Sequence, residues 1–126
     1  MSNTCRWLIG GFLLVALALA GCSSSEPDRE LSELGAQGRE ISLSRGCSAC
    51  HGDDGEGGVG PAWQGLAGST VRLEGGTAVV VDADYLRRAM VDPQAEIVEG
   101  VTITMPVSEL TEDEIVALIA YIEELQ

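Results

Sequence analysis

The chain has 126 residues, which is enough for at most one domain. It carries 20 acidic residues against 7 basic ones, all of them arginine, for a formal net charge of −13 at neutral pH. This balance excludes a nucleic-acid-binding protein, which needs a basic surface. A partner attracted by charge would present a basic patch, although the acidity would equally serve solubility or adaptation to salt.

Residues 1–21 are typical of a secretory signal, with Arg6 followed by an uncharged apolar run from Leu8 to Ala20. That run is too short for a comfortable membrane span. It ends in Leu-Ala-Gly before Cys22, which resembles a bacterial lipobox and implies cleavage before Cys22 and lipid attachment to it. A plain cleaved signal and an uncleaved anchor are the alternatives. We prefer the lipoprotein, because the cysteine directly follows the small residues of a cleavage site.

Residues 22–33 are expected to form a flexible tether, since Ser23 to Arg29 is polar, contains a proline and lacks periodicity. Residues 34–126 are expected to form the folded domain. An exported chain anchored through Cys22 would lie in the bacterial cell envelope, on the periplasmic or outer face.

The sequence predicts a first helix from about Leu34 to Arg45, after which Gly46 leads into a cysteine motif. Gly38 lies in the middle of this helix, where glycine is unfavourable. Close approach of another helix would explain it.

The motif is Cys47-Ser48-Ala49-Cys50-His51. Two cysteines three positions apart and an adjoining histidine are typical of covalent attachment of a c-type haem. On one helical turn both thiols reach the vinyl groups of one porphyrin, and His51 supplies an axial imidazole. A zinc site needs about four ligands, and a thioredoxin-like redox pair needs a βαβ setting; beyond residue 22 the sequence supplies neither. We therefore predict one covalent haem c, bound through Cys47 and Cys50.

A glycine-rich loop follows from Gly52 to Pro61. Pro61 fixes the backbone where a carbonyl could accept a hydrogen bond from the second ring nitrogen of His51, which a metal-bound histidine requires. Trp63 could donate its indole N–H to a haem propionate, but a partly buried core tryptophan is an equal alternative.

Later segments predict one hairpin and two helices. Valine-rich runs around Gly75-Gly76 predict a small β-hairpin over residues 71–81. Asp82 is expected to cap a helix that ends before Pro93. Thr111 and Glu114 form a capping box for the last helix, which carries one apolar stripe. The fold class is therefore all-α, with helices around one haem and a small hairpin insertion.

The second axial ligand follows by elimination. His51 is the only histidine and the chain lacks lysine, so methionine is the remaining strong candidate. Met90 lies on an expected helix face, where methionine usually packs in the core. Met105 precedes Pro106, which favours extended backbone able to lay a thioether across a haem. We predict His51 and Met105 as the iron ligands; Met90 and an open or water-bound iron are the alternatives.

Over residues 35–126 the chain resembles the class I c-type cytochromes. The resemblance rests on the cysteine motif with Gly52, on Gly60-Pro61, on Met105-Pro106 and on the ending Ala120-Tyr121-Ile122. It implies that Gly38 and Tyr121 mark the crossing of the first and last helices.

A narrower likeness is carried by Gly68 to Thr77, Val80-Val81-Asp82, Tyr85-Leu86, Asp92-Pro93 and Ile97 to Gly100. These segments resemble the cytochrome c domain fused to subunit II of caa-type cytochrome oxidases. The chain lacks the membrane helices and copper domain of those subunits, so a free-standing lipoprotein related to that domain is expected.

The expected function is a membrane-tethered electron carrier of a respiratory chain, without enzymatic activity of its own. It would pass single electrons to a terminal oxidase. A dedicated haem subunit of a larger oxidoreductase complex is the first alternative, and a haem-based gas or ligand sensor is the second.

Overall fold

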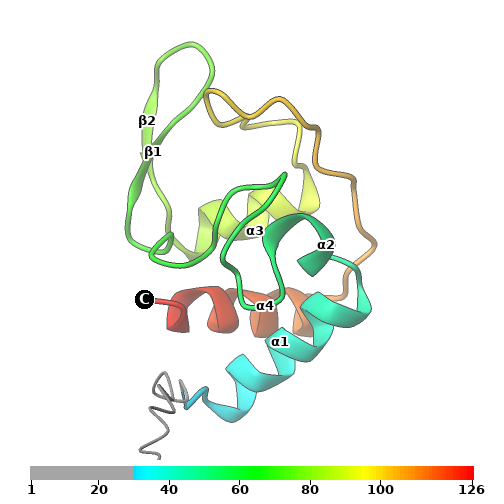
Figure 1. Ribbon diagram of the computed structural model, residues 1–126. Coiled ribbons are helices and arrows are strands. Elements are labelled where there is room, and N and C mark those ends of the chain that lie inside the picture. Colours follow the sequence, from blue (N-terminus) through cyan, green and yellow to red (C-terminus); the bar gives the residue numbers. More distant parts are fainter. Residues whose placement is uncertain (1–29) are drawn as a thin grey trace, which may run out of the picture.

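The computed structural model describes residues 30–126 and shows four helices and one two-stranded antiparallel sheet in that range (Figure 1). The elements are α1 (Glu33–Ser44), α2 (Ser48–His51), β1 (Thr70–Arg72), β2 (Ala78–Val80), α3 (Ala83–Val91) and α4 (Glu112–Glu124). This agrees with the predicted helical fold carrying a small hairpin. The expected signal and most of the expected tether, Cys22 included, lie outside the described residues.

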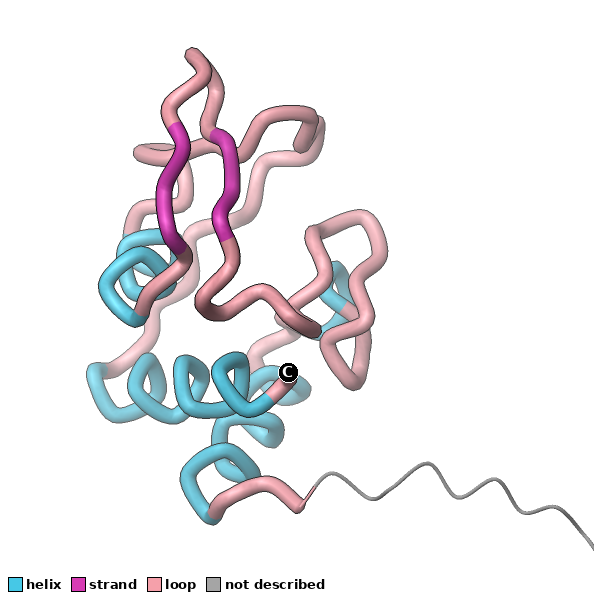
Figure 2. The backbone as a smooth tube through the Cα atoms, turned by 90° about the vertical axis from the view of Figure 1, so that its left-hand side faces the viewer, coloured by secondary structure: helices cyan, strands magenta, loops and turns pink. Residues whose placement is uncertain are grey.

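The first and last helices cross at Gly38. A Cβ atom at this position would overlap the carbonyl oxygen of Ala117 and lie 2.8 Å from the Cβ of Tyr121, both in α4. Only glycine allows the two backbones to approach this closely. The crossing expected at Gly38 and Tyr121 is therefore observed. In two perpendicular views, α4 lies between α1 on one side and α3 with the hairpin on the other (Figure 1, Figure 2).

The start of α1 is tied to the end of α4. The Ser32 hydroxyl accepts a hydrogen bond from the Gly35 backbone N–H at 3.0 Å and so caps α1. The same hydroxyl donates to Glu124 at 2.5 Å, and the Ser32 backbone N–H donates to Glu124 at 2.9 Å. These bonds hold the start of α1 and the end of α4 together.

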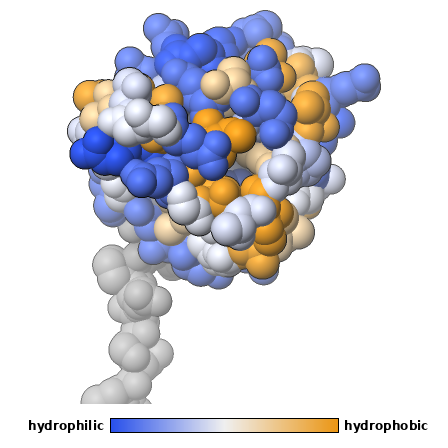
Figure 3. Space-filling view, turned by 90° about the horizontal axis from the view of Figure 1, so that it is seen from above, coloured by the Kyte–Doolittle hydropathy of each residue, from blue (hydrophilic) through white to orange (hydrophobic). Residues whose placement is uncertain are grey.

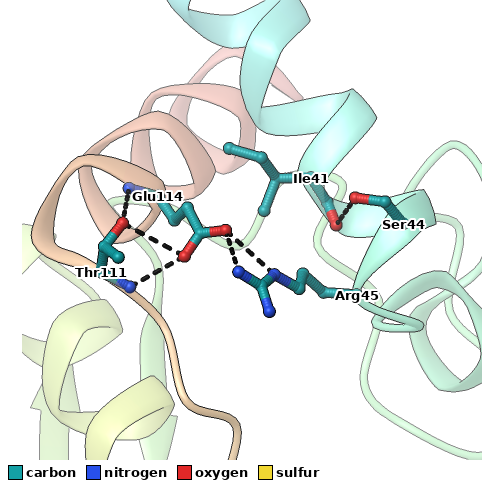
Figure 4. A network of polar contacts seen from close by, with 5 residues as sticks. All are labelled: Ile41, Ser44, Arg45, Thr111 and Glu114. Carbon is teal, nitrogen blue, oxygen red and sulfur yellow. Dashed lines mark hydrogen bonds and ion pairs between the residues drawn. The ribbon is translucent and has the colours of Figure 1, made fainter.

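A second contact joins the other ends of the same helices (Figure 4). Thr111 and Glu114 form the predicted capping box, in which the Thr111 backbone N–H donates to the Glu114 carboxylate at 2.8 Å. Arg45, at the end of α1, donates its Nε–H to that carboxylate at 2.9 Å. Glu114 therefore fixes the start of α4 to the end of α1, next to the cysteine motif.

These hydrogen bonds give Glu114 a pH-dependent role. The backbone N–H of Thr111, and then the Arg45 guanidinium, lower the pKa of Glu114 below its ordinary value of 4.5. Its carboxylate therefore stabilises the fold above pH 4.5, and this contribution is lost as the pH falls through the lowered pKa of the folded state. Glu114→Gln is expected to reduce stability at neutral pH and to flatten the decline in acid.

Urea midpoints of the wild type and Glu114→Gln, taken from neutral to acidic pH, would measure this contribution. The exposed Glu123 on the same helix supplies the control variant Glu123→Gln. If the difference between the urea midpoints of the wild type and Glu114→Gln stays constant across the pH range, the proposed contribution is contradicted.

The third helix and the hairpin form largely as predicted. The Asp82 carboxylate caps α3 by accepting the Tyr85 backbone N–H at 2.7 Å, and α3 ends before Pro93. Strands β1 and β2 pair in antiparallel register, with Val71 opposite Val79.

A third segment, which the sequence did not predict, runs beside the hairpin. The Glu74 backbone N–H donates to the Ile97 carbonyl at 2.8 Å, and the Glu99 N–H donates to the Arg72 carbonyl at 2.8 Å. Between them Leu73 and Val98 form an isolated antiparallel bridge. These bonds bring the chain that follows α3 back against the hairpin.

The core forms where α3, α4 and the residues before the hairpin meet. The predicted apolar stripe of α4 is buried, as are Leu86 and Met90 of α3. Trp63 joins them with 6 % of its surface exposed.

Within residues 30–126, no helix combines the length and apolar character needed to cross a membrane.

Candidate haem site

The cysteine motif forms a single helical turn. Gly46, with φ of +78°, turns the backbone out of α1, and α2 follows at once. Cys47 occupies the N-cap with helical backbone angles, and the His51 backbone N–H donates to its carbonyl at 3.1 Å. The two thiols are half-buried and free. Burial raises the pKa of the Cys47 thiol above its ordinary value. Both sulfur atoms and the imidazole therefore lie on one turn, as the predicted attachment chemistry requires.

His51 is buried and held by the loop that follows it. Its Nδ1 lies 2.8 Å from the Pro61 carbonyl oxygen. A carbonyl only accepts hydrogen bonds, so Nδ1 carries the proton and Nε2 keeps the lone pair that binds a metal. The contact predicted between Pro61 and His51 is present.

The glycine-rich loop wraps closely around this turn. The Gly57 backbone N–H donates to the His51 carbonyl at 2.7 Å, and the Gly60 N–H donates to the Cys50 carbonyl at 2.9 Å. A Cβ on Gly60 would lie 3.0 Å from Cε1 and 3.2 Å from Nδ1 of His51. Glycine therefore lets the backbone pass along the edge of the imidazole, a role that the sequence analysis did not assign to Gly60.

Trp63 packs on the face of the imidazole. Its indole stacks on the His51 ring with centroids 4.5 Å apart and an interplanar angle of 19°. On its other side it meets Tyr121 edge to face, at 6.2 Å and 89°. Trp63 is buried in the core, and its expected hydrogen bond to a haem propionate stays a prediction. The stack on His51 had no signal in the sequence, because it depends on how the loop folds back.

A cavity of about 380 Å³ opens beside the motif, and Cys50, His51 and Trp63 contribute to its wall. Its volume lies within the roughly 300–1,000 Å³ of typical cofactor pockets. The remaining wall comes mostly from apolar side chains of α3 and of the segment between α3 and α4. Apolar side chains also interrupt the hydrophilic surface of the face seen in Figure 3.

Both candidate methionines lie on this cavity. Met105 contributes from the irregular segment before α4, where its backbone carbonyl accepts a hydrogen bond from Gln94 Nε2 at 3.3 Å. Met90 contributes from α3 and is 7 % exposed. The fold therefore brings two thioethers and one imidazole to the same cavity.

The residues present fit a covalent haem better than they fit a zinc ion or a thioredoxin-like redox pair. Two thiols, an imidazole with a free Nε2 and a thioether adjoin one largely apolar cavity. In the described part of the chain, no group of three or more histidine, cysteine or acidic side chains could hold a metal ion, which disfavours zinc. Along the chain, the motif follows helix α1 and precedes the hairpin, whose two strands are antiparallel. A thioredoxin-like pair needs parallel strands joined by a helix, and residues 30–126 contain no such unit.

The comparison with protein families agrees with this geometry. The family model of cytochrome c matches residues 35–126, which is more than two thirds of the chain. No curated relative matches the sequence. Members of this family carry covalently bound haem c and generally transfer electrons rather than act as enzymes. The chain belongs to the cytochrome c family and is a c-type haem protein of electron transfer.

Proposed function

We propose that the protein is a membrane-tethered carrier of single electrons in a respiratory chain, with one haem ligated by His51 and Met105. The observation that supports histidine–methionine ligation is the cavity shared by the Pro61-bound imidazole and the two methionines, and the backbone around Met105 then favours it over Met90. Haem bound there supplies a one-electron couple. If His51 and Met105 both bind the iron, the protein would leave it no open coordination site for a substrate, which favours electron transfer over catalysis.

Each residue of the site has a separate task in this proposal. Cys47 and Cys50 would hold the porphyrin through thioether bonds, and His51 would offer Nε2 to the iron. Pro61 keeps the proton on Nδ1 and thereby keeps Nε2 available. The soft thioether of Met105 favours the reduced state and raises the reduction potential relative to a second histidine.

Met105 is preferred over Met90 on backbone grounds. Met105 precedes Pro106, which disfavours helical geometry and leaves the side chain on an irregular segment. Met90 lies in α3, where its buried side chain packs with the apolar core. A thioether on an irregular segment can turn across the cavity without unwinding a helix.

Met105→Ala tests the ligand assignment. The oxidised wild type is expected to show a thioether-to-iron charge-transfer band, and Met105→Ala is expected to lose it and to have a lower reduction potential. Met90→Leu, which conserves volume in the core, is the matched control and should keep the band. A band that is absent from the wild type, or that survives Met105→Ala, would show the assignment to be wrong.

The charge distribution supports a partner with a basic docking patch. Each of the five arginines within residues 30–126 forms an ion pair with a carboxylate; these residues are Arg39, Arg45, Arg72, Arg87 and Arg88. The remaining acidic side chains therefore dominate the field around the folded domain. Opposite charge on the partner would accelerate their encounter.

Anchoring and partner identity rest on the sequence. The lipobox at Cys22 and the polar segment after it support a lipid tether on the periplasmic or outer face of the cell envelope. The likeness to the cytochrome c domain of caa-type oxidases supports a terminal oxidase as the electron acceptor.

A further inference from the structure

The His51 imidazole is fixed by three different contacts. Pro61 accepts a hydrogen bond from Nδ1 in the plane of the ring, and the Gly60 backbone lies along the ring edge. Trp63 covers one face, with the two rings 19° from parallel. The in-plane bond alone leaves the ring able to rock about the Nδ1–oxygen axis. A flat side chain on its face restricts that motion.

Trp63 is itself held firmly enough to act in this way. Its backbone N–H donates to the Gly55 carbonyl at 2.8 Å, and its ring is almost fully buried. The edge-to-face contact with Tyr121 ties the indole to α4, close to the crossing at Gly38. The orientation of the imidazole therefore depends on the most tightly packed part of the core.

The stack also has an electrostatic consequence. The face of an indole carries negative electrostatic potential and attracts positive charge. An imidazole bound to oxidised iron bears more positive charge than one bound to reduced iron. Contact with the Trp63 face therefore stabilises the oxidised protein more than the reduced protein.

We propose that Trp63 is a positioning residue for the axial imidazole: its stacking fixes the plane of the His51 ring and lowers the reduction potential of the haem. This inference rests on the ligation of iron by His51 in the proposed function. Pro61 and Trp63 have distinct effects, since Pro61 sets which nitrogen is protonated and Trp63 sets the ring plane and its electrostatic environment.

Trp63→Leu tests this directly, because it removes the aromatic face and keeps an apolar side chain. The equilibrium is expected to shift about threefold toward the reduced form, which equals about 28 mV at 59 mV per tenfold change for one electron. Trp63→Phe retains a weaker aromatic face and should lie between the wild type and Trp63→Leu. The potential is measured by equilibrium redox titration of the haem-loaded protein.

The sign of the shift separates this role from a structural one. A variant that merely loosens the core admits water, which favours the more charged oxidised state and lowers the potential. Leu118→Ala provides that control, because Leu118 is buried in α4 and is neither part of the cavity wall nor of the ring stack. It should reduce stability without raising the potential. A potential of Trp63→Leu that is unchanged or lower than wild type would overturn the proposal.

The orientation of the ring has its own readout. Proton NMR shifts of the haem methyl groups in the oxidised protein depend on the plane of the axial imidazole. Their spread is expected to change in Trp63→Leu, to return toward wild type in Trp63→Phe and to be retained in Leu118→Ala. Should Trp63→Leu fail to fold, Trp63→Met decides, because it also keeps an apolar side chain without an aromatic face. A wild-type potential and wild-type shifts in Trp63→Met would refute the role.

Failure of this inference is distinguishable from failure of the proposed function. If the wild type shows the thioether charge-transfer band and Trp63→Leu leaves the reduction potential unchanged, only the role of Trp63 is rejected. A wild type without the band rejects the His51–Met105 ligation itself.

Discussion

Gly38→Ala is expected to destabilise the folded protein by about 3 kcal/mol, the upper range for adding a methyl group to a close-packed interior. The new Cβ would overlap the Ala117 carbonyl oxygen and lie 2.6 Å from the Ala117 carbonyl carbon. Backbone atoms of a packed helix cannot turn aside as a flexible side chain can, so α1 and α4 must separate. Urea unfolding of the haem-loaded protein, followed by far-UV circular dichroism, measures the loss.

Gly35→Ala is the matched control, one turn earlier in α1. Both substitutions gain about 1 kcal/mol of helix propensity. At Gly35, however, the nearest atoms to the added methyl are those of the Glu124 carboxylate, a side chain that can rotate away once its hydrogen bonds with Ser32 break. Gly35→Ala is therefore expected to be much less destabilising than Gly38→Ala. Equal midpoints for the two variants would contradict a backbone clash at the helix crossing.

Replacing Cys47 and Cys50 together with alanine is expected to abolish covalent haem attachment and to leave the chain largely unfolded. Without haem, the largely apolar wall of the 380 Å³ cavity would lose its packing partner and stay exposed to water. The entire stability of a typical small domain is about 5–15 kcal/mol. Haem is therefore as important for the core as for electron transfer.

The double variant would be produced in a bacterium that attaches haem to exported proteins. Two quantities are measured. The first is the amount of haem that stays bound to the polypeptide after denaturation, and the second is the far-UV circular dichroism spectrum. Ser48→Ala, between the cysteines, should retain both haem and helical content. A double variant that folds like the wild type would show that the cavity does not need its cofactor for stability.

Local features made much of the fold predictable. The N-caps of α3 and α4 were predicted because a capping side chain and the backbone N–H that donates to it lie within three residues. The first helix was displaced by only one residue at each end, with Arg45 as its C-cap. The cysteine motif and the Pro61 contact were also predicted, because chemistry fixes their spacing.

The parts that escaped prediction depend on residues distant in sequence. The pairing of Glu74 with Ile97 joins the hairpin to a segment beyond α3, and neither segment signals its partner. The stack of Trp63 on His51 requires the intervening loop to reverse direction around several glycines. The choice between Met90 and Met105 also needs more than the fold, since both side chains reach the cavity.

The hydrogen bonds of Ser32 to Glu124 have a mechanical consequence. Tension on the chain before Ser32 would act first on the end of α4 and then on the crossing at Gly38. Among the described residues that line the cavity, none comes from α1, and α4 contributes only Ile122. A pull on this end of the chain would thus act on the α1–α4 pair before it reached most of the residues that line the cavity.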